Sequence, residues 1–204
     1  MKLSDSASEP SYLESSLGSF FGLVSSDEPA PAGGSVAAAA AGLAAALCVK
    51  AALLSTRQMS DVLDIVAAGE LLRDRAGVLC QADADVYRLV IEAMRLPREP
   101  DARDRRRAIT VALKRASDVA AEIAEIAADV ADVAARIAES GNPNLLGDVV
   151  TAALLAEASA RSAAALVRIN LEGEPDVELI AALSELLEKT AQSSARARRV
   201  LLID

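Results

Sequence analysis

The chain has 204 residues, a formal net charge of -9 at neutral pH, two cysteines, no tryptophan and no histidine. Without histidine, Ser-His-Asp and Cys-His catalytic arrangements are excluded, and two cysteines cannot supply a four-cysteine zinc site. Acid–base chemistry must therefore come from carboxylates, lysine, tyrosine, cysteine or water. The acidic balance disfavours nucleic acid as a partner, because phosphate binding requires a basic surface.

The composition favours a single all-α domain over residues 1–204. Hydrophobic residues make up 52% of the chain, which excludes disorder, and only 2% are aromatic, which argues against a β-sandwich. Alanine alone accounts for 45 residues. Small side chains allow helices to approach closely, and they leave flat surfaces that a second copy of the chain could cover.

The N-terminal residues are polar and lack the apolar stretch of a signal peptide. The longest apolar run, Val36 to Leu54, has a length that could span a bilayer, but it is mostly alanine and contains Lys50. We therefore expect a buried helix and no membrane partner. The two unpaired cysteines favour a cytoplasmic location.

Sparse proline, glycine and asparagine residues divide the chain into six expected helices. These cover approximately residues 10–25, 36–58, 61–96, 101–140, 143–170 and 175–203. Ser35, Ser60 and Asn142 are the expected N-caps of the second, third and fifth helices. Gly141 suits a left-handed residue at the end of the fourth helix. Long helices with short connections predict an antiparallel bundle.

Two early segments could carry chemistry. The turn Gly33-Gly34-Ser35 enters a helix, where free backbone N–H groups could hold an anion or a polar ligand; the alternative is an ordinary loop with a serine cap. Asp83 and Tyr87 are four residues apart and share a helix face. Asp83 either points inward, where a carboxylate needs a partner or a task, or is a solvated surface acid.

Later candidates lie in the second half of the chain and at the end of the second helix. Asp148 is a single acid among apolar neighbours. It is either buried in a functional site or exposed to solvent at the edge of its helix. Arg161 and Arg168 are seven residues apart and share a face, where they could meet an anionic ligand or form an ordinary surface pair. Arg57 ends the second helix, where the helix dipole favours a cation in any case.

Four segments, in this order, resemble the motifs of the cyclodeaminase/cyclohydrolase family of folate enzymes. EPAPAGGSVAAAAAGLAAAL looks like the family's Pro-Gly-Gly-Gly-Ser-Val-Ala-Ala opening, and ADADVYRLVIEAMRLPRE looks like its Asp-Ala-x-Ala-aromatic helix. GNPNLLGDVVTAALL is similar to its Gly-Asn-x-x-x-x-Ser-Asp turn, and VRINLEG to its Asn-Val-x-Ile-Asn-Leu end. The resemblance covers nearly the whole chain and implies an all-helical, dimeric protein that binds reduced folate near its subunit interface.

The chain keeps some family positions and changes others. The matching residues are Gly33, Gly34, Ser35, Arg57, Asp83, Asn142, Asp148 and Asn170. Four positions depart from the family pattern: Ala32 replaces a glycine, Gln81 an acid, Gly147 a serine and Leu166 an asparagine.

The resemblance implies methenyltetrahydrofolate cyclohydrolase activity, with Asp83 as base and Asp148 as second acid or positioning group. Tyr87 would pack on the pteridine, and the Gly33-Gly34-Ser35 turn would hold polar edges of the ligand. Arg57, or Arg161 with Arg168, would meet the glutamate tail. Asn142 and Asn170 complete the expected substrate-binding set.

No metal and no cofactor beyond the folate substrate are expected for this reaction. One alternative is formiminotetrahydrofolate cyclodeaminase activity in the same site, although a chain without a formiminotransferase domain favours the cyclohydrolase. The other alternative is a non-catalytic helical dimer that binds folate or a partner, which the departures from the motifs suggest.

Overall fold

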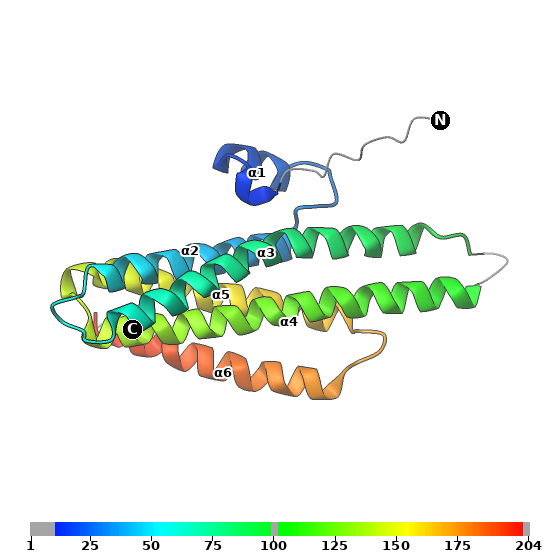
Figure 1. Cartoon of the computed structure of the whole chain (residues 1–204). Helices are drawn as coiled ribbons and strands as arrows, with labels where there is room; N and C mark the ends of the chain where they lie inside the picture. Colours follow the sequence, from blue (N-terminus) through cyan, green and yellow to red (C-terminus); the bar gives the residue numbers. More distant parts are fainter. Residues whose placement is uncertain (1–10, 99–101, 202–204) are drawn as a thin grey trace.

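The computed structural model describes residues 11–98 and 102–201, and these ranges contain helices and turns but no strand. Six α-helices form the architecture (Figure 1). They are α1 (Leu17–Val24), α2 (Gly33–Leu53), α3 (Val62–Arg95), α4 (Ala102–Ser140), α5 (Leu146–Asn170) and α6 (Val177–Arg199), with short 3₁₀ helices at Tyr12–Glu14 and Pro143–Leu145. The all-helical class and the number of helices expected from the sequence are thus confirmed.

Helices α2 to α5 pack lengthwise, and α6 lies along α4 and α5. Figure 1 shows that α3 and α4 run side by side, and that the end of α3 and the start of α4 extend beyond the ends of the other helices. Helix α2 packs against three other helices, α3, α4 and α5. The start of α2 lies against α3 near Asp83, since the Ser35 hydroxyl donates a hydrogen bond to that carboxylate.

The core combines alanine-rich helix faces with a few branched side chains. Helix α2 buries mainly alanines, whereas Ile123, Ile126 and Val130 of α4 are fully buried and supply bulk. At Gly69 of α3 an added Cβ would come within 2.7 Å of the Val49 side chain on α2. Small residues at the α2–α3 contact thus allow the two helix backbones to approach closely.

Two stretches are long and apolar enough to cross a bilayer, Gly33–Leu53 and Pro143–Asn170. Half of each apolar window is buried inside the bundle. The core helices of soluble proteins have the same length and composition.

The first helix differs from the expected continuous segment over residues 10–25. It is divided into a 3₁₀ turn and α1, because the Ser16 side chain caps α1 by accepting a hydrogen bond from the Ser19 N–H. No residue of α1 is buried, and Leu17 and Phe21 are more than 60% exposed. In Figure 1, α1 lies outside the bundle, above the region where α2 begins.

Three of the local expectations at the helix ends were wrong. Ala32, and not Ser35, is the N-cap residue of α2, and Ser35 lies buried in the first turn. Asp61 takes the N-cap position expected for Ser60. No glycine within the described ranges has a positive φ, so Gly141 is not left-handed. An added Cβ at Gly141 would meet the Ile137 carbonyl oxygen and the Ser55 hydroxyl.

The end of the second helix also differs. Helix α2 ends at Leu53, and the segment 54–58, which includes Arg57, forms turns. The expected cap at Asn142 is confirmed, since its side chain accepts a hydrogen bond from the Asn144 N–H at 3.1 Å. This cap begins the 3₁₀ turn that leads into α5.

Candidate functional site

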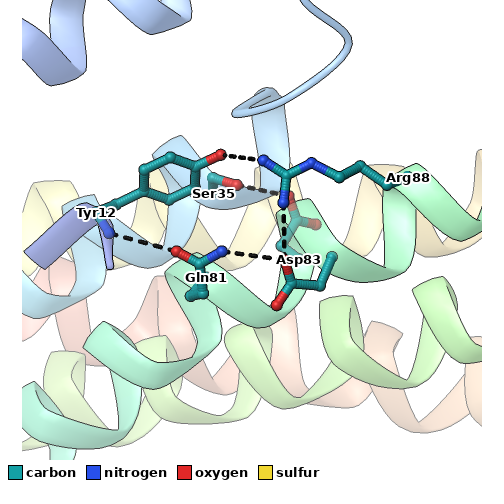
Figure 2. A network of polar contacts seen from close by, with 6 residues as sticks. Tyr12, Ser35, Gln81, Asp83 and Arg88 are labelled. Atoms are coloured by element: carbon teal, nitrogen blue, oxygen red, sulfur yellow. Dashed lines mark hydrogen bonds and ion pairs between the residues drawn. The ribbon is translucent and has the colours of Figure 1, made fainter. Parts of the chain in front are cut away.

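A buried carboxylate lies where α3 passes the start of α2. The Asp83 residue is only 9% exposed, and its Oδ2 atom accepts a hydrogen bond of 2.9 Å from the Ser35 hydroxyl (Figure 2). Burial raises the pKa of Asp83 above its ordinary value of 3.8, while hydrogen bonds from the Ser35 side chain and backbone lower it in part. The surroundings therefore favour proton uptake by this carboxylate, which is typical of a general base.

The glycine that precedes Ser35 makes this contact possible. A methyl group added at Gly34 would overlap the Asp83 carboxylate, whereas one added at Gly33 would meet no atom within 4 Å. The first backbone N–H groups of α2 point out of the N-terminal end of the helix, where Asp83 lies. The Ala32 side chain cannot accept hydrogen bonds from them, so it provides no cap. The positive end of the helix dipole also favours the ionised carboxylate.

A second polar cluster fastens the N-terminal segment to α3. Arg88 donates to the Tyr12 hydroxyl at 3.1 Å and to Asp85 Oδ1 at 2.9 Å, and Gln81 donates to the same Asp85 oxygen at 3.0 Å. Gln81 Oε1 in turn accepts a hydrogen bond from the Tyr12 backbone N–H at 3.3 Å. Figure 2 shows Tyr12, Gln81 and Arg88 joined in this way. Tyr12 was not among the candidate residues of the sequence, because nothing in its local pattern indicates contact with a helix about 70 residues away.

Asp148 lies at the other end of α2. It forms an ion pair of 2.9 Å with Lys50, and the two side chains are 36% and 57% exposed, respectively. Ser35 and Lys50 are 15 residues apart on α2, which corresponds to about 22 Å at 1.5 Å per residue. A single chain therefore does not bring Asp83 and Asp148 together.

Asn142 and Arg57 lie at the same end of the bundle as Asp148. The Asn142 side chain donates to the Leu54 carbonyl at 3.1 Å, and its backbone N–H donates to the Ser55 hydroxyl at 2.9 Å. These bonds tie the α4–α5 turn to the end of α2, so Asn142 has a structural role there. Arg57 is exposed in the turn after α2.

The two arginines of α5 lie on the side of this helix that meets α6. Arg161 pairs with Glu157 at 2.8 Å, and Arg168 donates to the Ser184 hydroxyl of α6 at 3.3 Å. Ser159 of the same helix faces the opposite way, since its hydroxyl donates to the Ala37 carbonyl of α2 at 2.7 Å. The arginines thus face away from α2 and its neighbour Asp83.

The remaining two candidates occupy different places. Tyr87 is 38% exposed, one helical turn beyond Asp83 on α3. Asn170 ends α5 and lines a cavity of about 640 Å³ between α4 and the α5–α6 turn.

Residues 16–189 match a family model described as formiminotransferase-cyclodeaminase. The chain belongs to this family. Formimidoyltransferase-cyclodeaminase of Mus musculus is 33% identical over 180 residues, which cover 84% of this chain and 33% of that protein. The chain thus spans about a third of the length of this relative.

Two other similar proteins are comparable in length to the chain. Methenyltetrahydrofolate cyclohydrolase of Methylorubrum extorquens is 29% identical over 161 residues, covering 75% of this chain and 77% of that protein. The crystal structure of formiminotetrahydrofolate cyclodeaminase from Thermotoga maritima superposes with a TM-score of 0.80 at 25% identity, covering 93% of this chain and 96% of that one. These relatives place the family among the enzymes of folate one-carbon metabolism.

The structure shows what occupies the positions that depart from the family motifs. Gln81 joins the cluster around Tyr12, and Leu166 is partly buried against the main core. Gly147 has open space around its Cα, and Ala32 begins α2 without a side-chain cap. The hydrogen bond between Ser35 and Asp83 is present together with these four departures.

The described ranges contain no group of three histidine, cysteine, aspartate or glutamate side chains arranged to hold a metal ion. Cys48 and Cys80 are buried, and burial raises their pKa values to about 12 and about 11. Both thiols are therefore protonated at neutral pH and are poor nucleophiles.

Proposed function

We propose that the chain is a methenyltetrahydrofolate cyclohydrolase, which hydrolyses 5,10-methenyltetrahydrofolate to 10-formyltetrahydrofolate. The observation that carries the proposal is the buried Asp83 carboxylate, hydrogen-bonded to Ser35 at the start of α2. The substrate has a cationic carbon between two nitrogens, and a carboxylate in a partly desolvated site attracts a cation strongly.

Asp83 acts as the general base in this scheme. Water forms a bond to the bridging carbon while its proton passes to Asp83. The bond between that carbon and N5 then breaks as N5 takes the proton back from Asp83. The hydroxyl of the intermediate loses its proton to solvent as the C=O bond of the formyl group forms on N10, so one net proton is released. The burial that raises the pKa of Asp83 makes its carboxylate a better proton acceptor than an exposed one.

The neighbouring groups orient the substrate. The first N–H groups of α2, at Gly33 and Gly34, bind polar edges of the pteridine, and Tyr87 packs on its flat face. Ser35 fixes the Asp83 carboxylate by its hydrogen bond. Gly34 acts by leaving room for this arrangement.

A homodimer would account for the separation of the two acids. The outer face of α2 and its neighbour α5 is apolar, with Val36, Leu43 and Leu154 between 40% and 60% exposed. Ser35 and Lys50 lie eight and seven residues from Leu43. A twofold axis near Leu43 would pack two α2 helices antiparallel and bring the partner subunit's Asp148 close to Asp83.

Subunit mixing tests this dimer. Asp83→Asn and Asp148→Asn chains should each be inactive alone, and the mixture should recover part of the wild-type rate, since each mixed dimer contains one intact site. A mixture that stays inactive, or a chain that sediments as a monomer at working concentration, contradicts the shared site.

The activity is tested with the methenyl absorbance of the substrate. Wild-type protein should accelerate its loss, Asp83→Asn should reduce the rate towards that of buffer, and the control Asp64→Asn, an exposed acid on the same helix, should retain full activity. If wild-type protein does not change the rate of loss, the proposal fails.

Formiminotetrahydrofolate cyclodeaminase is the second candidate, favoured by the Thermotoga maritima structure, whose chain matches this one over 96% of its length. In that reaction N10 would attack the formimino carbon, and a protonated carboxyl group would assist the departure of ammonia. Formation of methenyl absorbance and ammonia from formiminotetrahydrofolate distinguishes this activity. If neither reaction is accelerated, the non-catalytic hypothesis holds.

A further inference from the structure

The cavity beside Asn170 has a composition that suits an elongated ligand with a flat body and an anionic end. Ile109 and Leu113 of α4 and Leu171 after α5 form apolar walls, while Arg106 and Asn170 contribute polar groups. Its volume is about 640 Å³, within the range of small-molecule sites.

The register of the α3–α4 hairpin places this cavity relative to Asp83. Arg75 pairs with Glu122 at 2.8 Å, and Arg105 donates to the Leu96 carbonyl at 2.9 Å. In this register Asp83 lies level with about residue 116 of α4. Along the helix axis, Leu113 is then about 5 Å and Arg106 about 15 Å from the level of Asp83, at 1.5 Å per residue.

We propose that this cavity binds the aminobenzoyl-glutamate arm of the folate substrate, with Arg106 paired to its carboxylates and Asn170 hydrogen-bonded to its amide. The inference rests on the proposed function, since a pteridine held at Asp83 would direct an arm of comparable length along α4. The benzoyl ring packs between Ile109 and Leu113.

Charge supports this direction of the arm. The chain carries a net charge of -9, which repels an anionic ligand, so a local cation is required. Arg106 forms no ion pair with any residue in the described ranges. Lys114, the other cation of the cavity, is already held by Asp118 at 2.7 Å and by Asp176 at 3.6 Å. Arg106 is therefore the group that the ligand can engage.

The cavity also contains acidic groups. Asp176 is bonded to the Leu179 N–H at 3.0 Å as well as to Lys114, so its charge is compensated. Glu174 is exposed and lines the same cavity. It would repel a carboxylate, and removing its charge should therefore strengthen binding.

The experiment compares two substrates and two matched variants. Methenyltetrahydrofolate carries the glutamate, and methenyltetrahydropteroate lacks it. Arg106→Gln should raise KM for the first substrate about tenfold or more, with little change in kcat, and leave KM for the second unchanged. Arg107→Gln, an exposed neighbour on α4 that does not line the cavity, should change neither value, and Glu174→Gln should lower KM for methenyltetrahydrofolate.

A binding measurement without turnover separates this site from the proposed reaction. p-Aminobenzoyl-glutamate should perturb the NMR signals of Asn170 and Leu113 in wild-type protein and not in Arg106→Gln, whose exposed side chain can be replaced without loss of folding. Binding without turnover in the wild type would overturn the proposed function and retain the site. Turnover with equal KM values in wild type and Arg106→Gln, or absence of fragment binding to wild type, would overturn the site.

Discussion

Two acids from other helices, Asp83 of α3 and Asp148 of α5, lie against opposite ends of α2 in different environments. Near its start, Asp83 is buried, touches Ser35 and lies against a glycine that leaves room for its carboxylate. Near its end, Asp148 faces Lys50 in a largely exposed ion pair. Both acids stand among apolar neighbours in the sequence, so the difference arises from what each one faces. Burial produces a carboxylate with altered proton affinity, whereas exposure produces a surface pair worth at most about 1 kcal/mol.

The strongest test of this contrast is Asp83→Asn. We expect the hydrolytic rate to fall about 10²- to 10⁴-fold, as is typical when a general base is removed. The variant should also melt at a higher temperature at neutral pH. Because the pKa of Asp83 is raised in the folded state, its contribution to stability is present below the unfolded pKa near 3.8 and is lost as pH rises through the folded pKa.

Thermal melts of both proteins across acidic and neutral pH measure this effect. The gain in melting temperature should shrink as the pH falls towards 3.8 and below. A variant that melts lower than wild type at neutral pH would mean that the ionised carboxylate stabilises the fold, contrary to the burial argument.

Substitution of the paired glycines tests the space around Asp83. Gly34→Ala should destabilise the fold by about 1–3 kcal/mol and reduce activity, because the new methyl group displaces the carboxylate. Gly33→Ala, one residue earlier and facing open space, should change the free energy of unfolding by less than about 1 kcal/mol. Equal effects in denaturant titrations of the two variants would contradict the close approach.

Removal of the Ser35 hydroxyl should change the pH dependence. Because this hydrogen bond lowers the pKa of Asp83, Ser35→Ala should raise that pKa further and move the acid limb of the rate profile to higher pH. Ser159→Ala removes another buried hydroxyl, which bonds α5 to α2, and costs about 1 kcal/mol without moving the limb. An acid limb at the same pH in Ser35→Ala and wild type would mean that Asp83 does not set it.

The smallest expected effect concerns the exposed pair. A double-mutant cycle of Lys50→Met and Asp148→Asn, measured by urea unfolding at one fixed protein concentration, should give a coupling energy between 0 and about 1 kcal/mol. High salt should reduce it further. A coupling of several kcal/mol would show that this end of α2 resembles the buried end.

The fold was largely predictable from local signals. Apolar residues at helical spacing and the boundaries at Pro97 and at Asn142-Pro143 identify most helices to within a few residues, since these signals act within a turn or two. The prediction that Ser35 caps α2 was wrong, and local signals could not have corrected it. Its hydroxyl can bond a nearby backbone N–H or a distant side chain, and its choice of Asp83 depends on α3 passing 48 residues further along the chain.

The sequence predicted which residues could form a site, but it did not predict which of them lie close together in space. Arg161 and Arg168 do share a helix face, as their spacing indicates, but the spacing contains no information on which neighbour that face meets, and it meets α6. Tyr12 joined the cluster on α3 through contacts that no local pattern signals.

By itself, the sequence determined an alanine-rich, all-helical chain of the folate-enzyme family without histidine chemistry, because composition, periodicity and ordered motifs are properties of the chain alone. Only the tertiary structure decided that Asp83 is buried against the start of α2, and that Asp148 forms an open ion pair with Lys50, about 22 Å further along α2 than Ser35. The physical reason is that desolvation depends on which helices pack against a carboxylate, and packing joins residues far apart in the sequence.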